Sequence, residues 1–442
     1  MENVKTSRLD KKYHDAVCRW RDTFLPDYPL LMDQWERFFP HEPCFRLCAY
    51  RQCAMGDTIE VGDDQGRPKF RQAGEMDERR ANQLLKAIEA QASTEFGSIQ
   101  QHQLTLSRAQ DEQDQFWILR MMAEELRHGY QMFSLLLGDD WRAVSDRSGE
   151  EMVDKVLSMR TGSHVLGAFN VDFDSFVDNI VFCALIDRVG KYQLQMQKVS
   201  AYRPMGESMP PMLREEAFHL AAGVVPLRRW IQNAARDEGY VTLDMIQKAL
   251  HKWFPRGLDM FGDERGGGSN VRLGLKPLKN AEALGQYVEE VQRLVDDLNT
   301  RFVRTRLPEL SREEADGLIE RVWQGETAQG IGPADLLRLP DVRFYRRRGV
   351  HAYRMYDIDG KPVQDLTDYR AHLGRHLPEV YPAGRDFKGY VDLMKKVTAG
   401  ELTPEEAVPL MPNLSRVGGV CPCSRAVRWL SDEPAGGNGG GS

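Results

Sequence analysis

Cysteines are scarce in this sequence, and none of them stands at a spacing typical of a zinc or dithiol site. The 442 residues include seven cysteines, and neither a C-x-x-C pair nor a ferredoxin-type cysteine run is present. This absence excludes the usual structural-zinc and iron–sulfur patterns. Ordinary reduced thiols are the favoured interpretation. The alternative is a metal or sulfide site shared by two cysteine groups, one of Cys44, Cys48 and Cys53 and one of Cys421 and Cys423.

Long hydrophobic runs are also missing. No stretch approaches the roughly 18 apolar residues that a membrane-spanning helix needs, and residues 1–12 lack the apolar core of a signal peptide. The net charge of −7 does not favour a broad nucleic-acid-binding surface. With 41% hydrophobic and 28% charged residues, the composition is that of a globular protein. We therefore expect a cytoplasmic protein that binds neither membrane nor nucleic acid.

Proline and glycine divide the chain into regions of different character. The middle is rich in helix-forming residues over long proline-free stretches, so we expect a mainly α fold built on a four-helix bundle, with extra helices and a small C-terminal α/β region. The predicted regions are an irregular start with a small hairpin (1–75), the bundle (76–255), helices and a small β-hairpin (256–433) and a disordered glycine-rich tail (434–442).

Apolar periodicity and breaker residues predict where the individual elements lie. Pro204, Pro210 and Pro211 are expected to break the chain before the fourth bundle helix begins. The N-terminal hairpin is predicted at 58–61 and 68–70, and the C-terminal one around the turn at 359–360, after strand-like stretches at 342–348 and 352–356. Helices are predicted at 13–24, 78–106, 109–137, 174–199, 211–236, 243–253, 280–301 and 311–324.

Two copies of the pattern E-x-x-H stand in the second and fourth predicted bundle helices. Glu125 and His128 form the first copy, and Glu216 and His219 the second. Residues three apart lie on one face of a helix, so the carboxylate and the imidazole of each copy can point at one metal ion. Each copy is preceded by a further acid, Glu124 or Glu215, which we expect to support the site rather than to bind metal. Arg127 and Arg214 are candidate partners of these acids.

An acid precedes each E-x-x-H copy at nearly the same distance. Glu95 stands 30 residues before Glu125, and Asp187 stands 29 residues before Glu216. Both acids fall on apolar helix faces, where an isolated carboxylate is costly unless it is paired, protonated or bound to metal. One acid from each of two helices, with E-x-x-H from each of the other two, is the ligand plan of di-metal carboxylate bundles.

The charges of this set also suit a buried di-metal centre. Four carboxylates and two neutral imidazoles carry −4, which two divalent cations would neutralise. Oxygen-rich ligands with some imidazole favour iron or manganese, and iron is the better choice for dioxygen chemistry. The plain alternative is a helical bundle with solvated E-x-x-H pairs. A single copy would fit that alternative, whereas two copies with matched acids favour the metal site.

Several stretches together resemble the oxygenase component of benzoyl-CoA epoxidase, a ferritin-like di-iron enzyme family of aerobic aromatic degradation in bacteria. The resemblance implies iron ligands at Glu95, Glu125, His128, Asp187, Glu216 and His219, because the family uses Asp at the third-helix position. The matching stretches are Gln91–Glu95, Ala123–His128, Leu185–Leu194, Glu215–His219, Met260–Gly262, Ser269–Asn270, Gly274–Lys276 and Leu339–Phe344.

The resemblance also implies a reaction. The family binds dioxygen at two irons and inserts one oxygen atom into the ring of an aryl-CoA thioester, forming an epoxide. The electrons come from NAD(P)H through a separate reductase. The sequence itself lacks a dinucleotide-binding fingerprint after a strand, which agrees with the need for a separate reductase. The expected partners are the reductase, dioxygen and the aromatic substrate, with a homodimer as one assembly open to the chain.

Candidates for substrate contact are fewer and weaker than the metal ligands. Gln91 lies one turn before Glu95 and could line the cavity or be a core residue satisfied by backbone. A CoA substrate needs cations for its phosphates. Lys276 and the run Arg346, Arg347 and Arg348 are candidates, although charge runs are usually solvated faces.

Three alternative functions stay open at this point. A different di-iron reaction, hydroxylation or N-oxygenation of a non-CoA substrate, would use the same ligands. A non-catalytic metal-binding scaffold or an iron store is the second, and the long chain after the bundle argues against storage. A radical-storing subunit is the third, but Met132 stands one turn after His128, where a tyrosine would be expected.

Overall fold

The computed structural model describes residues 3–53, 55–262 and 268–339, with short segments at 355–356, 362–363, 396, 399–403 and 406. The chain divides into two compact units. The first comprises residues 1–170 and 175–339, and the second residues 171–174 and 340–442. The predicted region boundaries after residues 75 and 255 both fall within the first unit and stay predictions. The predicted tail at 434–442 lies outside the described residues.

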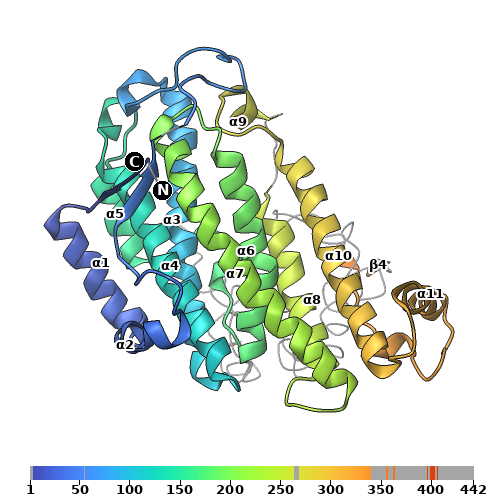
Figure 1. Cartoon of the computed structure of the whole chain (residues 1–442). Coiled ribbons are helices and arrows are strands. Elements are labelled where there is room, and N and C mark those ends of the chain that lie inside the picture. Colours follow the sequence, from blue (N-terminus) through green and yellow to red (C-terminus); the bar gives the residue numbers. More distant parts are fainter. Residues whose placement is uncertain are drawn as a thin grey trace. The chain divides into compact units, whose positions relative to one another are not determined.

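Four long helices form a bundle and confirm the predicted mainly α fold. They are α3 (Glu78–Gln103), α4 (Glu112–Leu137), α6 (Phe176–Gln197) and α7 (Arg203–Ala235), which lie side by side in Figure 1. The connection between α4 and α6 carries a shorter helix, α5 (Gly149–Ser158). None of the helices in the described ranges is long and apolar enough to cross a membrane.

Side-chain caps set where the first two bundle helices begin. The Asp77 carboxylate accepts a hydrogen bond from the backbone N–H of Arg80 at the start of α3. Asp111 accepts one from Gln113 N–H at the start of α4. Such caps satisfy backbone donors that have no partner within the helix. Both helices carry a continuous buried face that leads to the middle of the bundle.

The prediction that prolines break the chain before the fourth helix is wrong. Helix α7 begins at Arg203, with Pro204 in its first turn, and continues through Pro210 and Pro211. Proline removes one backbone donor and crowds the preceding turn, but packing can compensate for both losses. Pro211 is buried within the bundle, which supplies that packing. The fourth helix is therefore longer than the sequence pattern indicated.

Close helix contacts in the bundle require glycine at two positions. A Cβ at Gly223 of α7 would lie 2.4 Å from the backbone nitrogen of Ala184 on α6. A Cβ at Gly129 of α4 would lie 2.6 Å from the ring of Phe96 on α3. Real Cβ atoms do not approach other atoms so closely. The absence of a side chain thus lets each helix pair pack at short range.

The N-terminal part differs from its prediction. It comprises β1 (Val4–Ser7), α1 (Lys11–Phe24), α2 (Tyr28–Phe38) and β2 (Ala49–Gln52), and β1 pairs antiparallel with β2. The two segments of the hairpin expected at 58–70 do meet, through an antiparallel bridge between Thr58 and Pro68 and backbone hydrogen bonds such as that from Ile59 N–H to the Arg67 carbonyl, but they form no regular strands. Phe70, at the end of the second segment, bridges to Tyr202.

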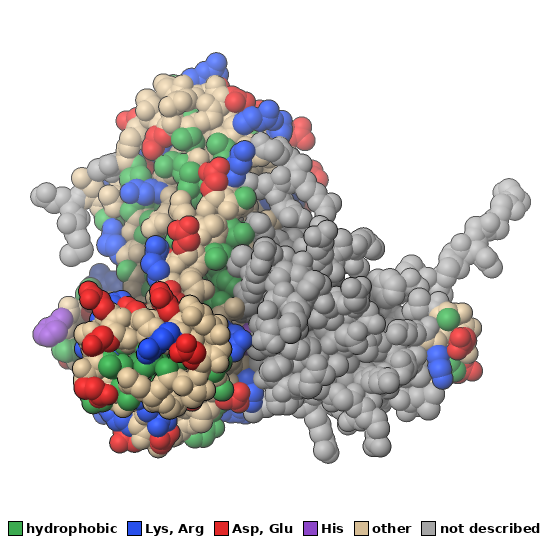
Figure 2. Space-filling model, turned by 90° about the vertical axis from the view of Figure 1, so that its right-hand side faces the viewer, with side chains coloured by type: hydrophobic (Ala, Val, Ile, Leu, Met, Phe, Trp, Pro, Cys, Tyr) green, Lys and Arg blue, Asp and Glu red, His purple; other side chains and the backbone are tan. Residues whose placement is uncertain are grey.

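The remaining helices of the first unit follow the bundle. They are α8 (Leu243–Met260), α9 (Ser269–Arg272), α10 (Asn280–Arg306) and α11 (Arg312–Trp323). The face that carries α10 and α11 shows acidic and basic side chains interspersed, without a field of one sign (Figure 2). Short 3-10 turns lie at Ala73–Glu75, Leu106–Arg108, Trp141–Ala143, Gly167–Asn170 and Pro333–Asp335.

In the second unit, β3 (Met355–Tyr356) and β4 (Pro362–Val363) pair antiparallel around the position of the expected C-terminal hairpin. Other predictions for this part of the chain, including the strand at 342–348, lie outside the described residues. Cys44, Cys48 and Cys53 are free thiols. Cys421 and Cys423, which the alternative interpretation placed in one site with them, lie outside the described residues.

Candidate metal centre

The four bundle helices bring all six predicted ligand residues into one buried cluster. Each is at most 6% exposed, so solvent is almost absent around them. Helices α3 and α6 each contribute one acid, and α4 and α7 each contribute one E-x-x-H pair. The six residues are Glu95, Glu125, His128, Asp187, Glu216 and His219.

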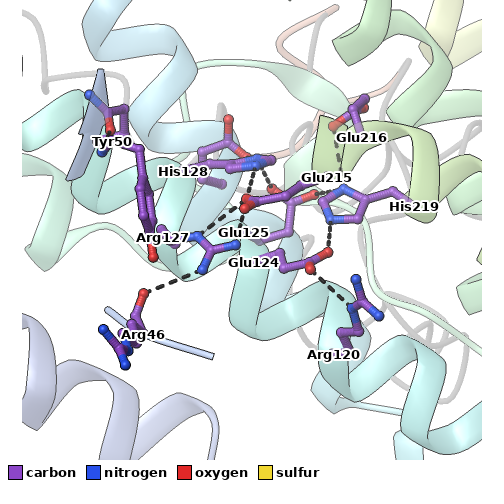
Figure 3. Close-up of polar contacts among 12 residues, drawn as sticks. Arg46, Tyr50, Arg120, Glu124, Glu125, Arg127, His128, Glu215, Glu216 and His219 are labelled. Carbon is purple, nitrogen blue, oxygen red and sulfur yellow. Dashed lines mark hydrogen bonds and ion pairs between the residues drawn. The ribbon is translucent and has the colours of Figure 1, made fainter. Parts of the chain in front are cut away.

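The two histidines present their Nδ1 atoms to the carboxylates. His128 Nδ1 lies 3.8 Å from an oxygen of Glu95 and 3.8 Å from one of Glu125. His219 Nδ1 lies 3.3 Å from Glu216 and 3.5 Å from the other oxygen of Glu125. The two rings are 5.4 Å apart between centroids. Glu125 therefore lies between the two histidines, with one oxygen toward each (Figure 3).

The potential ligand atoms form three overlapping sets, each within 4.8 Å. One set joins Glu95, Glu125 and His128, and another joins Glu125, Asp187 and His219. The third joins Glu216 with both histidines. Glu125 and the two histidines thus each belong to two sets, and Glu216 joins both histidines in one set. Overlap of this kind suits two neighbouring cations that share carboxylates between them.

Several buried polar atoms of the cluster have no hydrogen-bond partner in the described structure. They are Glu125 Oε2, Asp187 Oδ2 and His219 Nδ1. Buried polar atoms are nearly always paired, so each such exception needs an explanation. Metal ligation would explain all three, because ligand atoms of these three residues lie within 4.8 Å of one another. Gly190 of α6 keeps part of that space open, since a Cβ there would lie 2.7 Å from Glu216 Oε1.

The pKa values of the cluster show the cost of holding these acids together without cations. Burial and the nearby charge of Glu95 raise the pKa of Glu125 well above its ordinary range. Burial and the charge of Glu216 raise the pKa of Asp187 to about 8. Burial alone would lower the pKa of His219, but hydrogen bonds to Glu124 and Glu216 raise it to about 10. Divalent cations would relieve the same crowding by favouring the ionised acids.

The Nε2 atom of each histidine, which is the ring nitrogen away from the cluster, contacts an acid from the other E-x-x-H helix. His128 Nε2 lies 2.9 Å from Glu215 of α7, and His219 Nε2 lies 3.2 Å from Glu124 of α4. Each acid is therefore the predicted supporting residue, and each reaches across the bundle (Figure 3). An imidazole that donates one N–H to a carboxylate keeps its other nitrogen free for metal.

Two arginines hold these supporting acids. Arg127 pairs with Glu215, and its guanidinium also lies over the rings of Phe45 and Tyr50. Arg120 pairs with Glu124 at 3.0 Å. Arg127 was a predicted partner, whereas Arg120 was missed, although its position four residues before Glu124 on one helix was the available signal.

The other predicted arginine does not take part. Arg214 is directed instead to Gln52, with its nearest nitrogen 3.5 Å from the amide oxygen. Its position next to Glu215 in sequence places it about 100° around the helix from that acid. Adjacent residues on a helix do not face each other, which is why the pairing crosses from α4 to α7.

The predicted substrate-contact residues do not form one site in the described structure. Gln91 donates a hydrogen bond to Glu95 from one turn earlier on α3. Lys276 is buried, bonds to Asn280 and lines a small cavity of about 90 Å³ with residues of α3 and α6, outside the ligand cluster. Arg346, Arg347 and Arg348 lie outside the described residues.

The fold and the cluster define a helical bundle with a buried carboxylate–histidine group that could hold metal. No family model matches the chain. The chain is similar to a curated protein, benzoyl-CoA oxygenase component B of Aromatoleum evansii, with 25% identity over 325 residues. The match covers 65% of this chain and 67% of that protein. This distant likeness supports a relationship to the oxygenases, and the name of the relative describes one component of such an enzyme.

Proposed function

We propose that this chain is the oxygenase component of a di-iron monooxygenase that inserts one oxygen atom of dioxygen into an aromatic substrate. An aryl-CoA thioester such as benzoyl-CoA is the proposed substrate, with an epoxide as the product. Electrons would come from NAD(P)H through a separate reductase. The observation that carries the proposal is the buried cluster of four acids and two histidines from four helices. The likeness to an oxygenase component supports it.

The chain's own residues suit the task of holding two cations. Glu95 with His128 would hold one, and Asp187 with His219 the other. Glu125 and Glu216 would serve both, because each lies near both histidines. Two iron ions bound there would supply the reductive activation of dioxygen. Carboxylates and imidazoles, with no thiolate in the cluster, are a ligand set that iron accepts readily.

The surroundings would fix the ligands and exclude water. Glu124 and Glu215 hold the outer histidine nitrogens, so that both Nδ1 atoms face the acids. Gln91 donates to Glu95 and thereby orients that carboxylate. Phe96 and Phe182, which are fully buried, contribute an apolar wall beside α3 and α6. Exclusion of bulk water protects a reactive site from side reactions.

The small cavity beside Lys276 is the proposed approach for the substrate. Its lining includes Leu84 and Ala87 of α3, which share one helical face with Gln91 and Glu95. The cavity therefore continues the line of residues that ends at the metal cluster. The ammonium group of Lys276 could meet a phosphate or carbonyl oxygen of the substrate.

The alternatives differ in substrate rather than in metal chemistry. Hydroxylation or N-oxygenation of a non-CoA substrate would use the same six ligands. A non-catalytic scaffold would bind metal but would not consume dioxygen with substrate. The histidine-supporting acids and buried arginines suit any metal-bound histidine, so consumption of dioxygen with substrate is what separates a catalytic centre from a scaffold.

The test is single-turnover oxidation of benzoyl-CoA. The chain is loaded anaerobically with ferrous iron, reduced chemically and exposed to dioxygen with benzoyl-CoA. We expect a product heavier by one oxygen atom, and incorporation of label from ¹⁸O₂. A variant with Glu125→Ala and Glu216→Ala should give none. Dioxygen uptake with unaltered benzoyl-CoA would redirect the search to other aromatic substrates, and no uptake with any substrate would overturn the oxygenase assignment.

A further inference from the structure

A second cavity lies on the N-terminal side of the bundle, away from the metal cluster. Its volume is about 680 Å³, and it lies where the β1–β2 pair meets the C-terminal end of α4 and the start of α7. Five basic side chains line it: Lys5, Arg8, Arg51, Arg71 and Arg203. They come from β1, the turn after it, β2, the segment before α3 and the first residue of α7.

The charge of the cavity contrasts with that of the chain. Only two acids, Asp10 and Glu207, join the five basic residues in its lining, which leaves a net charge of +3. The whole chain carries −7. Five basic residues from different parts of the chain therefore gather at one place in an acidic protein. Such concentration raises the local potential and favours an anion there.

Most of these basic residues lack an anionic partner. Arg203 pairs with Glu207 at 2.7 Å and with Asp57. Within the ranges that the structure describes, Lys5, Arg8, Arg51 and Arg71 form no ion pair. Four of the five cations are thus available to a ligand.

The arrangement carries a cost to the fold. Lys5 of β1 and Arg51 of β2 are direct partners across the antiparallel pair. Side chains of directly opposite residues lie on the same face and close together, and like charges in these positions destabilise the pair. No acid of the described chain offsets this repulsion by pairing with either residue. An anionic ligand would offset it.

We propose that this cavity binds a small molecule that carries at least two phosphate groups, of the size of a nucleotide diphosphate. The volume lies within the range of about 300–1,000 Å³ that is usual for small-molecule sites. Guanidinium groups match phosphate oxygens in pairs, which explains arginine at four of the five positions. Ser134 and Cys53 add polar groups to a lining that is otherwise part apolar, as a nucleoside requires.

The site is separate from the metal centre. Ser134 and Leu137 of α4 line the cavity and follow His128 by six and nine residues, which corresponds to about 9 and 14 Å along the helix. The proposal does not depend on the proposed oxygenase function. A diphosphate could come from the nucleotide half of a CoA substrate or from a free nucleotide that acts as an effector.

Calorimetric titration of the full chain tests the proposal, with ADP, CoA and inorganic pyrophosphate as separate probes. We expect binding that weakens as salt rises, because exposed charges are screened. Lys5→Gln with Arg51→Gln should weaken it at least tenfold, and Arg71→Gln, outside the strand pair, should weaken it as well. Arg236→Gln, at the opposite end of α7, should bind as the wild type does.

The probes separate the two sources of ligand. Tighter binding of CoA than of ADP would assign the cavity to the nucleotide half of the substrate, whereas equal or tighter binding of ADP would assign it to a free nucleotide. Both outcomes support a diphosphate site. Absence of binding for all three probes at millimolar concentration would overturn it, as would unchanged affinity in the Lys5 and Arg51 double variant.

Thermal unfolding is a second measurement, which distinguishes ligand binding by Lys5 and Arg51 from a purely structural role of these residues. Without ligand, the Lys5→Gln and Arg51→Gln double variant should melt at the same temperature as the wild type or slightly above it, because it removes the opposed charges. With ADP or CoA present, only the wild type should gain stability, since ligand binding to the native state raises Tm. A double variant that melts lower but keeps its affinity would contradict the proposal.

Discussion

The carboxylate of Glu124 on α4 lies 3.2 Å from Nε2 of His219 on α7. An ionised carboxylate only accepts hydrogen bonds, so Nε2 must carry a proton, and Nδ1 is then the nitrogen that can bind a metal ion once it has lost its own proton. That nitrogen faces Glu125 and Glu216. Glu124 on α4 therefore orients the candidate ligand His219 on α7. In the same way, Glu215 on α7 orients His128 on α4.

The Glu124→Gln substitution should lower metal affinity about tenfold without unfolding the chain. The neutral amide keeps the shape but accepts a weaker hydrogen bond, so His219 is held less firmly in the correct tautomer. Competition with a chelator of known affinity measures the loss. Glu112→Gln on the same helix is the matched control, because Glu112 is exposed and pairs with Arg37 on the surface, away from the cluster. Unchanged affinity in Glu124→Gln would remove the supporting role from this acid.

The Gly190→Ala substitution should separate metal binding from fold stability. Alanine is favoured over glycine within a helix by roughly 0.5–1 kcal/mol, so the metal-free chain should unfold at a similar or higher denaturant concentration. The added methyl would lie against the carboxylate of Glu216 and displace it. We expect fewer bound ions per chain in the variant, measured by elemental analysis. A variant that loads metal fully would show that Glu216 has room to move aside.

Acid should destabilise the fold through His164, which is buried beside Ser93 and Gln100. Burial lowers the pKa of His164 from 6.5 to about 4. Between these pH values the imidazole is protonated in the unfolded chain but not in the folded chain. The contribution of the neutral His164 to the free energy of unfolding is therefore complete above about pH 6.5 and declines as the pH falls. From pH 7 to pH 5 the loss is at most about 2 kcal/mol.

Urea unfolding at a series of pH values measures that effect. His164→Gln keeps groups that can bond to Ser93 and Gln100 but does not titrate. Its free energy of unfolding should change less between pH 7 and pH 5 than that of the wild type. Parallel pH curves for the two proteins would assign the acid sensitivity to other groups.

The Lys276→Met substitution should affect substrate binding more than oxygen chemistry. Methionine fills similar space without the charge, so KM for benzoyl-CoA should rise about tenfold while kcat changes little. Lys86→Met, an exposed lysine on α3, is the control for loss of a positive charge. Steady-state kinetics with the reductase, or single-turnover titration of substrate, measures the difference. Equal loss of kcat and of kcat/KM would place Lys276 nearer the reaction than we propose.

The sequence predicted the bundle and its cluster because both depend on local periodicity. Glu125 and His128 share a helix face by spacing alone, and Glu95 and Asp187 are conspicuous as acids on apolar faces. The structure brings all of these residues together. The crossed pairs of Glu124 with His219 and Glu215 with His128 depend instead on how α4 and α7 face each other, which spacing within one helix does not determine.

The β1–β2 pairing and the full length of α7 could not be predicted from the sequence, and the reasons are related. The β1–β2 pair joins residues 4–7 to residues 49–52, and such non-local pairing leaves little signal in a short polar segment. Helix α7 continues through Pro210 and Pro211 because tertiary packing outweighs the local preference of proline to end a helix. In both places the surrounding structure decides the outcome, and local sequence preference does not.

Metal content tests directly whether the buried cluster of four acids and two histidines binds two metal ions. The purified chain is loaded anaerobically with ferrous iron, desalted and analysed for iron, manganese and zinc, beside the Glu125→Ala and Glu216→Ala double variant. We expect about two irons per chain in the wild type and almost none in the variant, with circular dichroism showing that both remain helical. A folded wild type that retains no metal, or a double variant that retains as much as the wild type, would contradict it.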